Sequence, residues 1–488
     1  MESPSDLFRR VARAVAQAEL EYGTVNEAAR WEEEFYKAMA GLLFLPNSPT
    51  LMNAGTPSGQ LSACFVLPVE DSLDSIFTAL KQAALIQKSG GGTGFNFSQL
   101  RPRGDFIHSS GGQSSGPVSF MKIYDATTEN IKQGGKRRGA KMGILNIDHP
   151  DIEAFIQVKM DEDALRNFNI SVGMRDTFME AVKHDAVWNL IHPVSKRVVK
   201  KVKAKKLWEL IVRCAWQHGD PGLIFLDAIH KNNPLPALGE IIATNPCAEM
   251  PLLPYESCNL GSINLARMVY KKKGKFEIDW QKIQSTITLA TRFLDNVIDV
   301  NYYEVPQIRA MTLGNRKIGL GVMGWAEMLI QLGIPYQSQE ALHLAEMLMQ
   351  FINRHSFLAS IQLARERGTF PNWKKSNYAA RQLEIRNATR TSIAPTGSIS
   401  ILANTSSSIE PLFALAYQRQ NVLNDQTLLE VNQLFVAHLK SQHLYTDTLM
   451  GEIVSSGNLK QHNNLPESTK NLFKTSLEIP YPTHLRHQ

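Results

Sequence analysis

Long amphipathic helical segments alternate along this chain with short runs of apolar or β-branched residues. One helical segment carries an apolar stripe that includes Ile283 and Ile287, with Asp279 as its expected N-terminal cap. A second is expected over residues 338–367, because Gly368 is a natural C-terminal stop. The short runs have the length of buried strands and cover residues 61–67, 143–147, 168–172, 241–244 and 391–394. This alternation predicts an α/β protein with largely parallel strands.

The N-terminal part of the chain differs from the rest. Residues 5–44 have helical spacing throughout, and the prolines at positions 46 and 49 then predict an irregular stretch. We therefore expect a helical region over residues 1–45 and an α/β domain over residues 46–488. A chain of 488 residues, 43% hydrophobic and 20% charged, is long enough for one large barrel with such an appendage.

The net charge of +6 is mild and suits nucleotides at least as well as a nucleic-acid surface. Basic clusters at residues 201–206 and 271–275 lack interleaved aromatic residues, so we expect solvated faces or hairpin tips and no nucleic-acid site. No apolar run is long enough to cross a membrane, and no signal peptide is visible. We expect a cytoplasmic protein without a membrane partner.

The chain has four cysteines, at positions 64, 214, 247 and 258. None forms a C-x-x-C pair, and no histidine pair stands nearby at zinc spacing, so we expect no metal site. A cytoplasmic protein keeps its thiols reduced, and a disulfide here would be transient and catalytic. Cys214 lies in an amphipathic helical segment and is expected to be a buried bystander.

An amide, a thiol and a carboxylate occupy alternate positions at Asn245, Cys247 and Glu249. Alternate side chains of an extended segment point the same way, so these three groups can converge on one small ligand. The flanking Pro246 and Pro251 stiffen the loop and preorganise it. The alternative is an ordinary loop with a buried cysteine.

Cys64 and Cys258 stand in polar or strand-end settings, like Cys247. Three such thiols permit one sulfur to carry a radical while the other two pass two electrons by closing a disulfide. A sulfur radical needs a dry pocket, and a reversible dithiol needs a path to an external reductant.

These motifs resemble the ribonucleotide reductase family. Asn-Pro-Cys-x-Glu at residues 245–249 and Ser-Cys-Asn-Leu-Gly-Ser-Ile-Asn at residues 257–264 are similar to its radical-loop region. Further motifs occur in the family's order at residues 46–55 and 394–407, and the resemblance runs from about residue 5 to about residue 485. The sequence of residues 88–97 and 133–145 is most similar to that of the adenosylcobalamin-dependent class. The resemblance implies a ten-stranded α/β barrel preceded by a small helical region.

The resemblance also implies a reaction, the reduction of ribonucleoside di- or triphosphates to deoxyribonucleotides. Cys247 would carry the thiyl radical, Glu249 would act as general base, and Asn245 would hold the ribose oxygens. Cys64 and Cys258 would supply the two electrons. Adenosylcobalamin as radical generator rests on the resemblance alone. Two alternatives stay open: a reductase whose radical comes from a metal-containing partner subunit, and a non-catalytic nucleotide-binding fragment of a split enzyme.

Eight residues match the family's substrate-binding positions: Ser48, Ala63, Gly92, Pro395, Thr396, Gly397, Ser398 and Ile399. The segment at residues 395–398 predicts a tight turn before a helix, whose N-terminus favours anions such as a diphosphate. A plain Pro-Gly turn is the alternative. The glycines at residues 90–94 lack a P-loop lysine and are a weak signal alone.

Four residues match the family's effector-binding parts: Asp71, Lys136, Arg137 and Arg138. The alternatives are a helix N-cap for Asp71 and a basic surface loop for the three cations. The resemblance further implies deoxynucleotide or ATP effectors, a homodimer and a thioredoxin-like reductant.

The sequence departs from the family pattern at three places. Ala248 stands where glycine is common, which costs stability if the site needs a positive φ. Lys141 stands where asparagine is expected, within the segment that would link effector and substrate. The family's last barrel strands, its C-terminal cysteine pair and the ATP-binding regulatory domain of some relatives are not recognised. We therefore expect either a second chain that completes the barrel or a fragment.

Overall fold

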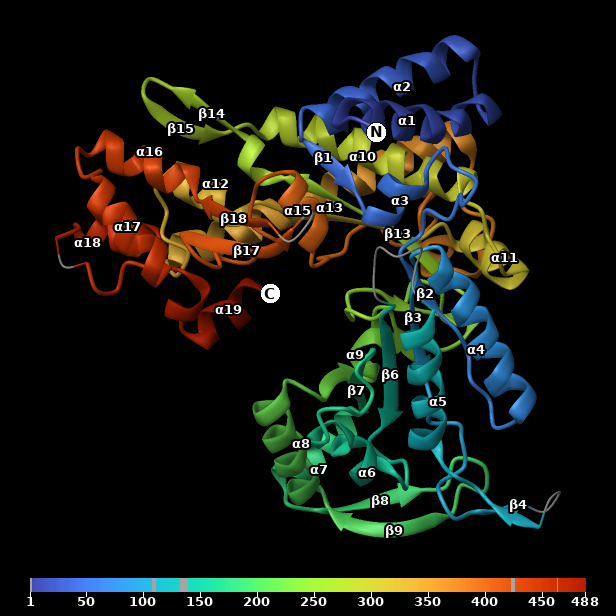
Figure 1. The fold of residues 1–488 in the computed structure, drawn as a ribbon. Helices are drawn as coiled ribbons and strands as arrows, with labels where there is room; N and C mark the ends of the chain where they lie inside the picture. Colours follow the sequence, from blue (N-terminus) through green and yellow to red (C-terminus); the bar gives the residue numbers. More distant parts are fainter. Residues whose placement is uncertain (1, 108–110, 132–138, 423–425, 463) are drawn as a thin grey trace.

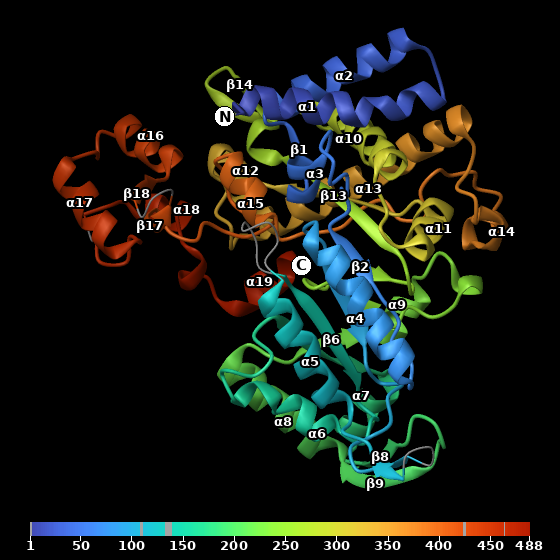
Figure 2. The same cartoon turned by 45° about the vertical axis from the view of Figure 1, so that its right-hand side comes forward.

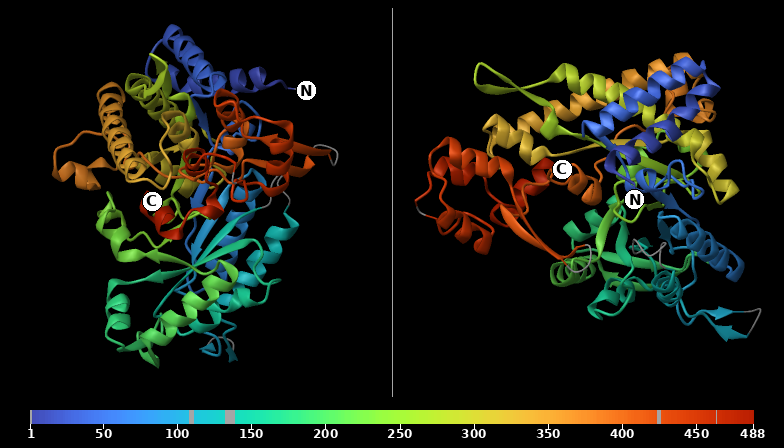
Figure 3. Two further views of the ribbon diagram at one scale, coloured as in Figure 1. Left: turned by 90° about the vertical axis from the view of Figure 1, so that its left-hand side faces the viewer. Right: turned by 45° about the horizontal axis from the view of Figure 1, so that its top comes forward.

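The computed structural model describes residues 2–107, 111–131, 139–422, 426–462 and 464–488 of the chain. The N-terminal helices lie over one end of a large sheet, and a group of C-terminal helices projects from the side (Figures 1 and 2). The C-terminus returns to the middle of the molecule (Figure 3). None of the helices in these ranges is long and apolar enough to cross a membrane.

The main sheet consists of two groups of strands that run in opposite directions. The strands of the first group are all parallel and lie in the order β10 (Gly222–Phe225), β7 (Phe168–Met174), β6 (Lys141–Asn146), β3 (Gly92–Asn96) and β2 (Cys64–Val66). β13 (Ser257–Asn264) is antiparallel to β2 and begins the second group, in which β16 (Ile318–Met323) is parallel to β13. β1 (Phe44–Pro46) is antiparallel to the far half of β13.

This arrangement confirms the predicted α/β class. The described part of the chain forms eight strands of the sheet, fewer than the ten expected of the family barrel. The predicted strand at residues 391–394 is reduced to one bridge between Thr391 and Leu320. Within the described residues, β10 and the segment at Thr391 therefore end the sheet on its two sides.

The strands predicted at residues 61–67, 143–147 and 168–172 are confirmed as β2, β6 and β7. The strand predicted at residues 241–244 is wrong in extent and in place. Only β11 (Ala243–Thr244) forms, and it pairs with β12 (Pro251–Leu252) in a hairpin outside the main sheet. Side chains alternate across β2, since Cys64 and Val66 pack with this hairpin while Phe65 packs on the outer face.

The hairpin lies directly on the inner face of the sheet at Gly94. A Cβ atom at Gly94 would come within 1.6 Å of the Thr244 carbonyl oxygen, so only glycine allows this approach. The outer face of the same strands is covered by α4 (Leu73–Lys88) and α5 (Pro117–Asn130) (Figure 1).

The predicted N-terminal helices are confirmed as α1 (Pro4–Ala16) and α2 (Val25–Ala40). Each begins with a capping box, formed by Ser3 with Asp6 and by Thr24 with Glu27. The irregular stretch predicted around the two prolines is wrong beyond β1, because α3 (Ser48–Asn53) forms there. Pro49 lies in the first turn of α3, where its missing N–H group is not needed.

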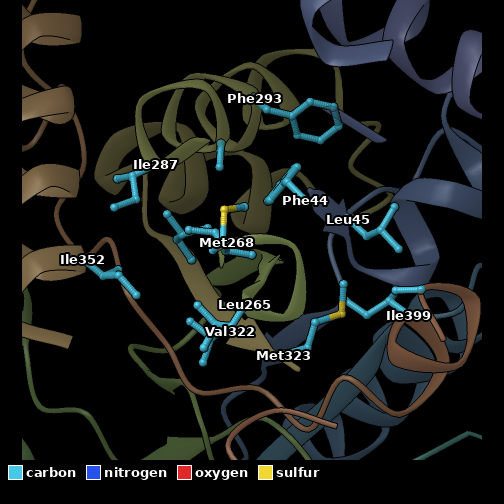
Figure 4. Close-up of a cluster of buried hydrophobic side chains, with 14 of the residues drawn as sticks. Phe44, Leu45, Leu265, Met268, Ile287, Phe293, Val322, Met323, Ile352 and Ile399 are labelled. Atoms are coloured by element: carbon cyan, nitrogen blue, oxygen red, sulfur yellow. The ribbon is translucent and has the colours of Figure 1, made fainter. Parts of the chain in front are cut away.

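A large apolar core joins the N-terminal helices to the second group of strands (Figure 4). Phe293 of α10 (Trp280–Val300) lies between Phe35 and Phe44, with ring centroids 5.0 and 5.4 Å apart. Ile399, directly after the predicted diphosphate turn, reaches the edge of this core. The core therefore anchors that turn to the frame of the barrel.

The long helix predicted at residues 338–367 is confirmed as α13 (Gln339–Arg367), and Asp279 caps α10 as expected. A buried ionic cluster ties the two helices together. Asp295 of α10 lies 2.9 Å from Arg316 and 3.0 Å from Arg367. Burial would raise the pKa of Asp295, but the facing guanidinium groups hold it below its ordinary value.

The C-terminal part forms a small lobe with its own core, which contains Leu415, Phe435 and Phe473. Its elements are β17 (Ala416–Val422), β18 (Gln426–Val431), α16 (Gln433–Ser441), α17 (Asp447–Ser456) and α18 (Glu467–Leu472). α19 (Tyr481–His487) then returns to the main body, where the His487 ring lies 4.0 Å from that of Tyr336.

The two basic clusters lie at exposed hairpins, as predicted. Residues 201–203 end β9 (Val198–Lys203), which pairs with β8 (Val187–Ile191). Residues 271–275 form the tip between β14 (Val269–Lys272) and β15 (Lys275–Ile278). The lysines there are largely solvated.

Candidate active site

The loop between β11 and β12 carries the amide, thiol and carboxylate singled out in the sequence. Asn245 closes this loop, because its Oδ1 accepts a hydrogen bond from the Met250 N–H group at 2.9 Å. Its Nδ2 group donates to Glu249 Oε2 at 2.6 Å and to Cys64 Sγ at 3.1 Å. Asn245 thus joins the loop to strand β2, and the predicted convergence of Asn245 and Glu249 is found.

Cys64 and Cys258 face each other across the sheet. They are directly paired residues of the antiparallel strands β2 and β13. Cα atoms of such pairs are about 4.5 to 5.5 Å apart, which lies within the range that a disulfide can span. Both residues are buried and carry reduced thiols. The pair can therefore close a disulfide without rearranging the sheet.

Burial raises the pKa of both thiols of this pair and of the half-buried Glu249 beside them. Burial raises the pKa of the Cys64 thiol well above its ordinary value, and Glu249 and the other two thiols raise it further. Burial also raises the pKa of the Cys258 thiol, although Lys317 opposes this effect. The pKa of Glu249 is likewise raised by burial, against the hydrogen bond from Asn245. The thiols thus hold protons that a reaction can use.

Cys247 lies at the tip of the loop, where it is exposed rather than enclosed in a dry pocket as expected. Ala248 beside it has a φ of +66°, the left-handed conformation that favours glycine. The site does need a positive φ, so alanine in place of the family's glycine costs stability here, and the loop tip carries backbone strain.

A cavity of about 390 Å³ opens beside the loop. Cys64, Asn245, Cys247 and Glu249 form one side of it. All eight residues that match the family's substrate-binding positions line it as well: Ser48, Ala63, Gly92, Pro395, Thr396, Gly397, Ser398 and Ile399. Residues from five separate parts of the sequence thus meet around one hollow of the size of a small-molecule site.

The predicted turn at residues 395–398 leads into α15 (Gly397–Leu402) as expected. Thr396 adopts a left-handed φ of +56°, and its Oγ1 accepts a hydrogen bond from the Ser408 N–H group at 2.8 Å. The first backbone N–H groups of a helix have no acceptor within it. Those of α15 belong to residues that line the cavity.

A second cavity, of about 1100 Å³, meets the same loop from another side. It is lined by Cys247, Ala248 and Glu249 and by side chains of β16, α12 (Trp325–Leu332) and α13. Sequence reasoning missed this cavity, because its lining comes from helix faces with no motif of their own.

Asp71, one of the effector-binding predictions, lines neither of these cavities. Asp71 accepts hydrogen bonds from the Arg101 N–H group at 3.0 Å and from Arg101 Nε at 2.8 Å. Ser72, not Asp71, caps α4, so the N-cap alternative for Asp71 is wrong. Lys136, Arg137 and Arg138 lie outside the described residues.

Lys141, which the sequence placed in the segment that would link effector and substrate, is the first residue of β6 and fully buried. Its Nζ group donates to the Tyr124 carbonyl oxygen at 3.0 Å and to Gln87 Oε1 at 3.4 Å. Burial lowers the pKa of Lys141 to about 7, with a small opposing effect of Asp125.

Sequence reasoning missed a buried ion pair behind Cys258. Lys317 Nζ lies 2.6 Å from Glu256 Oε2, and each side chain is only 1% exposed. Glu256 directly precedes the Ser-Cys motif, and Lys317 directly precedes β16, a strand that the sequence did not predict. The signal that could have predicted this ion pair is a residue of opposite charge directly before each of the two buried strands, Glu256 before β13 and Lys317 before β16.

The chain matches known proteins over its whole length. Residues 62–385 and 379–488 match the family described as "Ribonucleotide reductase, barrel domain", and residues 1–59 match "Ribonucleotide reductase, all-alpha domain". A vitamin B12-dependent ribonucleoside-diphosphate reductase of Thermoplasma acidophilum is 54% identical over 95% of this chain and 60% of its own length. One of Mycobacterium tuberculosis is 48% identical over 100% of this chain and 69% of its own.

Among solved structures, the alpha subunit of the Actinobacillus ureae class Id ribonucleotide reductase has a similar fold. Its TM-score is 0.76 at 24% identity, over 98% of this chain and 84% of that chain. The present chain thus spans about three fifths to two thirds of the length of the curated relatives named above.

Proposed function

The chain belongs to the ribonucleotide reductase family, and from this premise we propose that it carries the active site of an adenosylcobalamin-dependent ribonucleoside-diphosphate reductase. The observation that supports this most is the meeting of Cys64, Cys258, Asn245, Cys247 and Glu249 beside one cavity. Two relatives with about half of their residues identical are named as vitamin B12-dependent reductases of diphosphates.

In the proposed reaction, Cys247 as a thiyl radical takes the hydrogen atom from C3′ of the ribose. Glu249 accepts the proton of the 3′-hydroxyl, which its raised pKa favours. Asn245 donates to the ribose oxygens while it keeps the loop closed. One facing thiol then gives its proton to the 2′-hydroxyl, which leaves as water, the other gives a hydrogen to C2′, and Cys64 and Cys258 supply two electrons as they close a disulfide. Glu249 returns its proton to the 3′-oxygen, and Cys247 gives the hydrogen atom back to C3′, which restores its thiyl radical.

The substrate would lie in the 390 Å³ cavity, with its diphosphate at residues 396–399. Backbone N–H groups at the start of α15 suit an anion, and the buried Ile399 keeps this turn in place. Gly92 has room for no side chain, because a Cβ atom there would come within 2.7 Å of Pro246. Backbone therefore forms that wall of the cavity.

The residues around the 1100 Å³ cavity fit a large cofactor that must reach Cys247. The cavity touches Cys247 directly, and Leu342, Met349 and Ile393 offer apolar surface to a flat ring system. His343 and Gln339 offer polar groups at its wall. When bound, adenosylcobalamin supplies the radical, while these side chains would hold it and keep water away from the sulfur.

The partners are part of the same proposal. A second chain that pairs with β10 and with the segment at Thr391 would complete the sheet, and the exposed Phe225 on β10 would be covered. Asp71 and the segment that contains Lys136, Arg137 and Arg138 would bind a deoxynucleotide or ATP effector in a homodimer. A thioredoxin-like dithiol would reduce the Cys64–Cys258 disulfide.

The test is turnover of a ribonucleoside diphosphate with adenosylcobalamin and a dithiol, without and with a candidate C-terminal partner chain. Cys247→Ser should abolish turnover but keep nucleotide binding, and Glu249→Gln should lower turnover by about 10²- to 10⁴-fold. Cys214→Ser, on the buried face of α8 (Ala204–His218), is the matched control and should keep full turnover. Turnover that survives Cys247→Ser contradicts the proposal. Activity that needs a metal-containing subunit but no cobalamin would assign the chain to the other class.

A further inference from the structure

The two sulfur atoms of the facing pair differ in access. Cys64 lines the 390 Å³ cavity together with Asn245 and Glu249. Cys258 does not line it and is 0% exposed, since it lies on the central strand β13 between β2 and β16. A reductant that enters through this cavity therefore meets Cys64 first.

The two sulfur atoms also differ in the charges beside them. Asn259 is paired with Ile318 in the parallel ladder of β13 and β16, so Cys258 and Lys317 are neighbours one position earlier. Lys317 is the cation that lowers the pKa of Cys258 against the effect of burial. The Glu249 carboxylate raises the pKa of both thiols, and Glu256 also raises that of Cys258, so the difference between them within the described residues is the cation Lys317, which acts on Cys258 and not on Cys64.

Lys317 is held at this place by Glu256, which is itself fixed by two further hydrogen bonds. Glu256 Oε2 accepts hydrogen bonds from the Lys317 ammonium group and from the Leu253 N–H group, each at 2.6 Å. Asn315 Nδ2 donates to the other carboxylate oxygen, Glu256 Oε1. Both charged side chains are excluded from solvent. A buried charge costs much free energy unless it is paired, so a lysine kept here needs a reason beyond stability.

Thiol–disulfide exchange is directional when its two sulfur atoms differ. The attacking thiolate bonds to one sulfur, and the other leaves with the bonding electron pair, more rapidly if its thiol has the lower pKa. Access favours attack at Cys64, and the ammonium group of Lys317 favours departure from Cys258.

We propose that Lys317 directs the reduction of the Cys64–Cys258 disulfide, so that an external dithiol attacks Cys64 and Cys258 leaves as a thiolate beside the lysine. The second thiol of the reductant then displaces Cys64, which takes up a proton, and the reductant ends as a disulfide. Two electrons pass from the dithiol to the protein. Lys317 acts as a positioning residue through Cys258. The inference rests on the dithiol role in the proposed function.

The test maps the intermediate of exchange and needs no reductase activity. The full chain is oxidised with diamide, treated briefly with 2-mercaptoethanol, alkylated with iodoacetamide and mapped by peptide mass spectrometry. We expect the mercaptoethanol adduct on Cys64 and the alkyl group on Cys258. The paired variant Lys317→Met/Glu256→Gln removes both charges and should slow exchange by about 3- to 10-fold.

Two further variants distinguish an effect on the direction of thiol–disulfide exchange from an effect on folding. Lys317→Arg keeps the positive charge and should keep both the Cys64 preference and most of the rate. Cys214→Ser is the control for other thiols and should exchange as the unmodified chain does. The rate of exchange against pH should change in the paired variant, which a merely structural role would not cause.

The outcomes distinguish this inference from the proposed function. If oxidation forms no Cys64–Cys258 disulfide, the dithiol role itself fails. If the disulfide forms but the adduct maps to Cys258, or if the folded paired variant exchanges at the same rate, Lys317 does not direct the exchange.

Discussion

Lys141 and Lys317 are both buried at the beginning of a strand of the main sheet, yet their surroundings differ. Lys317 lies 2.6 Å from the Glu256 carboxylate. Lys141 donates to a backbone carbonyl and a side-chain amide, and no carboxylate of the described residues lies within ion-pair distance of it. Burial lowers the pKa of Lys141 to about 7. The contrast teaches that two lysines at equal depth can differ in whether a carboxylate faces the ammonium group.

The two lysines therefore make opposite demands on stability. Lys317 contributes as one half of a pair, and removing either half leaves a buried charge without compensation. Lys141 costs free energy at any pH at which the unfolded chain holds its proton, because the folded state must either bury the charge or give up the proton. Its folded pKa lies below that of an exposed lysine, so this cost is complete below pH 7 and disappears as the pH rises to about 10.5.

The largest effect is expected for Lys317→Met alone. This change leaves the Glu256 carboxylate buried and unpaired and should lower the free energy of unfolding by about 3 to 5 kcal/mol. Lys317→Met/Glu256→Gln removes both charges and should recover most of this loss. Denaturant titration of the three proteins at pH 7.5 measures the effect. Equal losses in the single and the paired variant would show that Lys317 is not held by its partner.

Lys141→Met tests the other half of the comparison through pH. Between pH 7 and 10.5 the unfolded chain binds more protons at residue 141 than the folded chain, so unfolding free energy rises with pH by up to about 1.4 kcal/mol per unit from this group. The variant lacks that contribution. Its advantage over the unmodified chain should be greatest near pH 7 and should shrink by pH 9.5. Parallel stability curves for the two proteins would mean that Lys141 keeps an ordinary pKa.

Gln87→Glu would give Lys141 the kind of partner that Lys317 has. Gln87 Oε1 already lies 3.4 Å from Lys141 Nζ, and Gln87 Nε2 has no hydrogen-bond partner within the described part of the chain, so a carboxylate loses little. We expect a higher Lys141 pKa and a stability gain of about 1 to 2 kcal/mol near pH 7 relative to pH 9.5. Gln82→Glu on the same helix is the matched control and should leave the pH dependence unchanged.

The sequence was sufficient for the parts of the molecule where one pattern has one meaning. Helices with caps and apolar stripes were predicted nearly to the residue, as at Asp279 and Gly368. The convergence of Asn245, Glu249 and the facing cysteines was predicted because motifs in a fixed order carry it. Three strands of the first group, β2, β6 and β7, were predicted because they are apolar runs, whereas β3 and β10 were not.

The sequence was insufficient where burial is polar or backbone packs on backbone. β13 contains the polar residues Ser257, Asn259 and Ser262 among its apolar ones and therefore has no apolar run. Every residue in it is nevertheless buried. Its polar side chains are satisfied by tertiary hydrogen bonds, such as that from Asn259 Nδ2 to the Leu294 carbonyl oxygen. β16 contains Gly319 and Gly321, which weaken a strand signal but allow close packing at Ser392. Neither arrangement is visible before the chain is folded.

Ala248→Gly measures a stability change that involves no charge, against which the effects of the two lysine variants can be compared. Ala248 has a φ of +66°, and glycine adopts that conformation without the steric cost of a Cβ atom. We expect a gain of about 0.5 to 1 kcal/mol in unfolding free energy, independent of pH. Ala29→Gly, in the exposed middle of α2, is the control and should cost about 1 kcal/mol. If Ala248→Gly changed stability as much as Lys141→Met near pH 7, backbone strain at the loop tip would equal the cost of the buried charge.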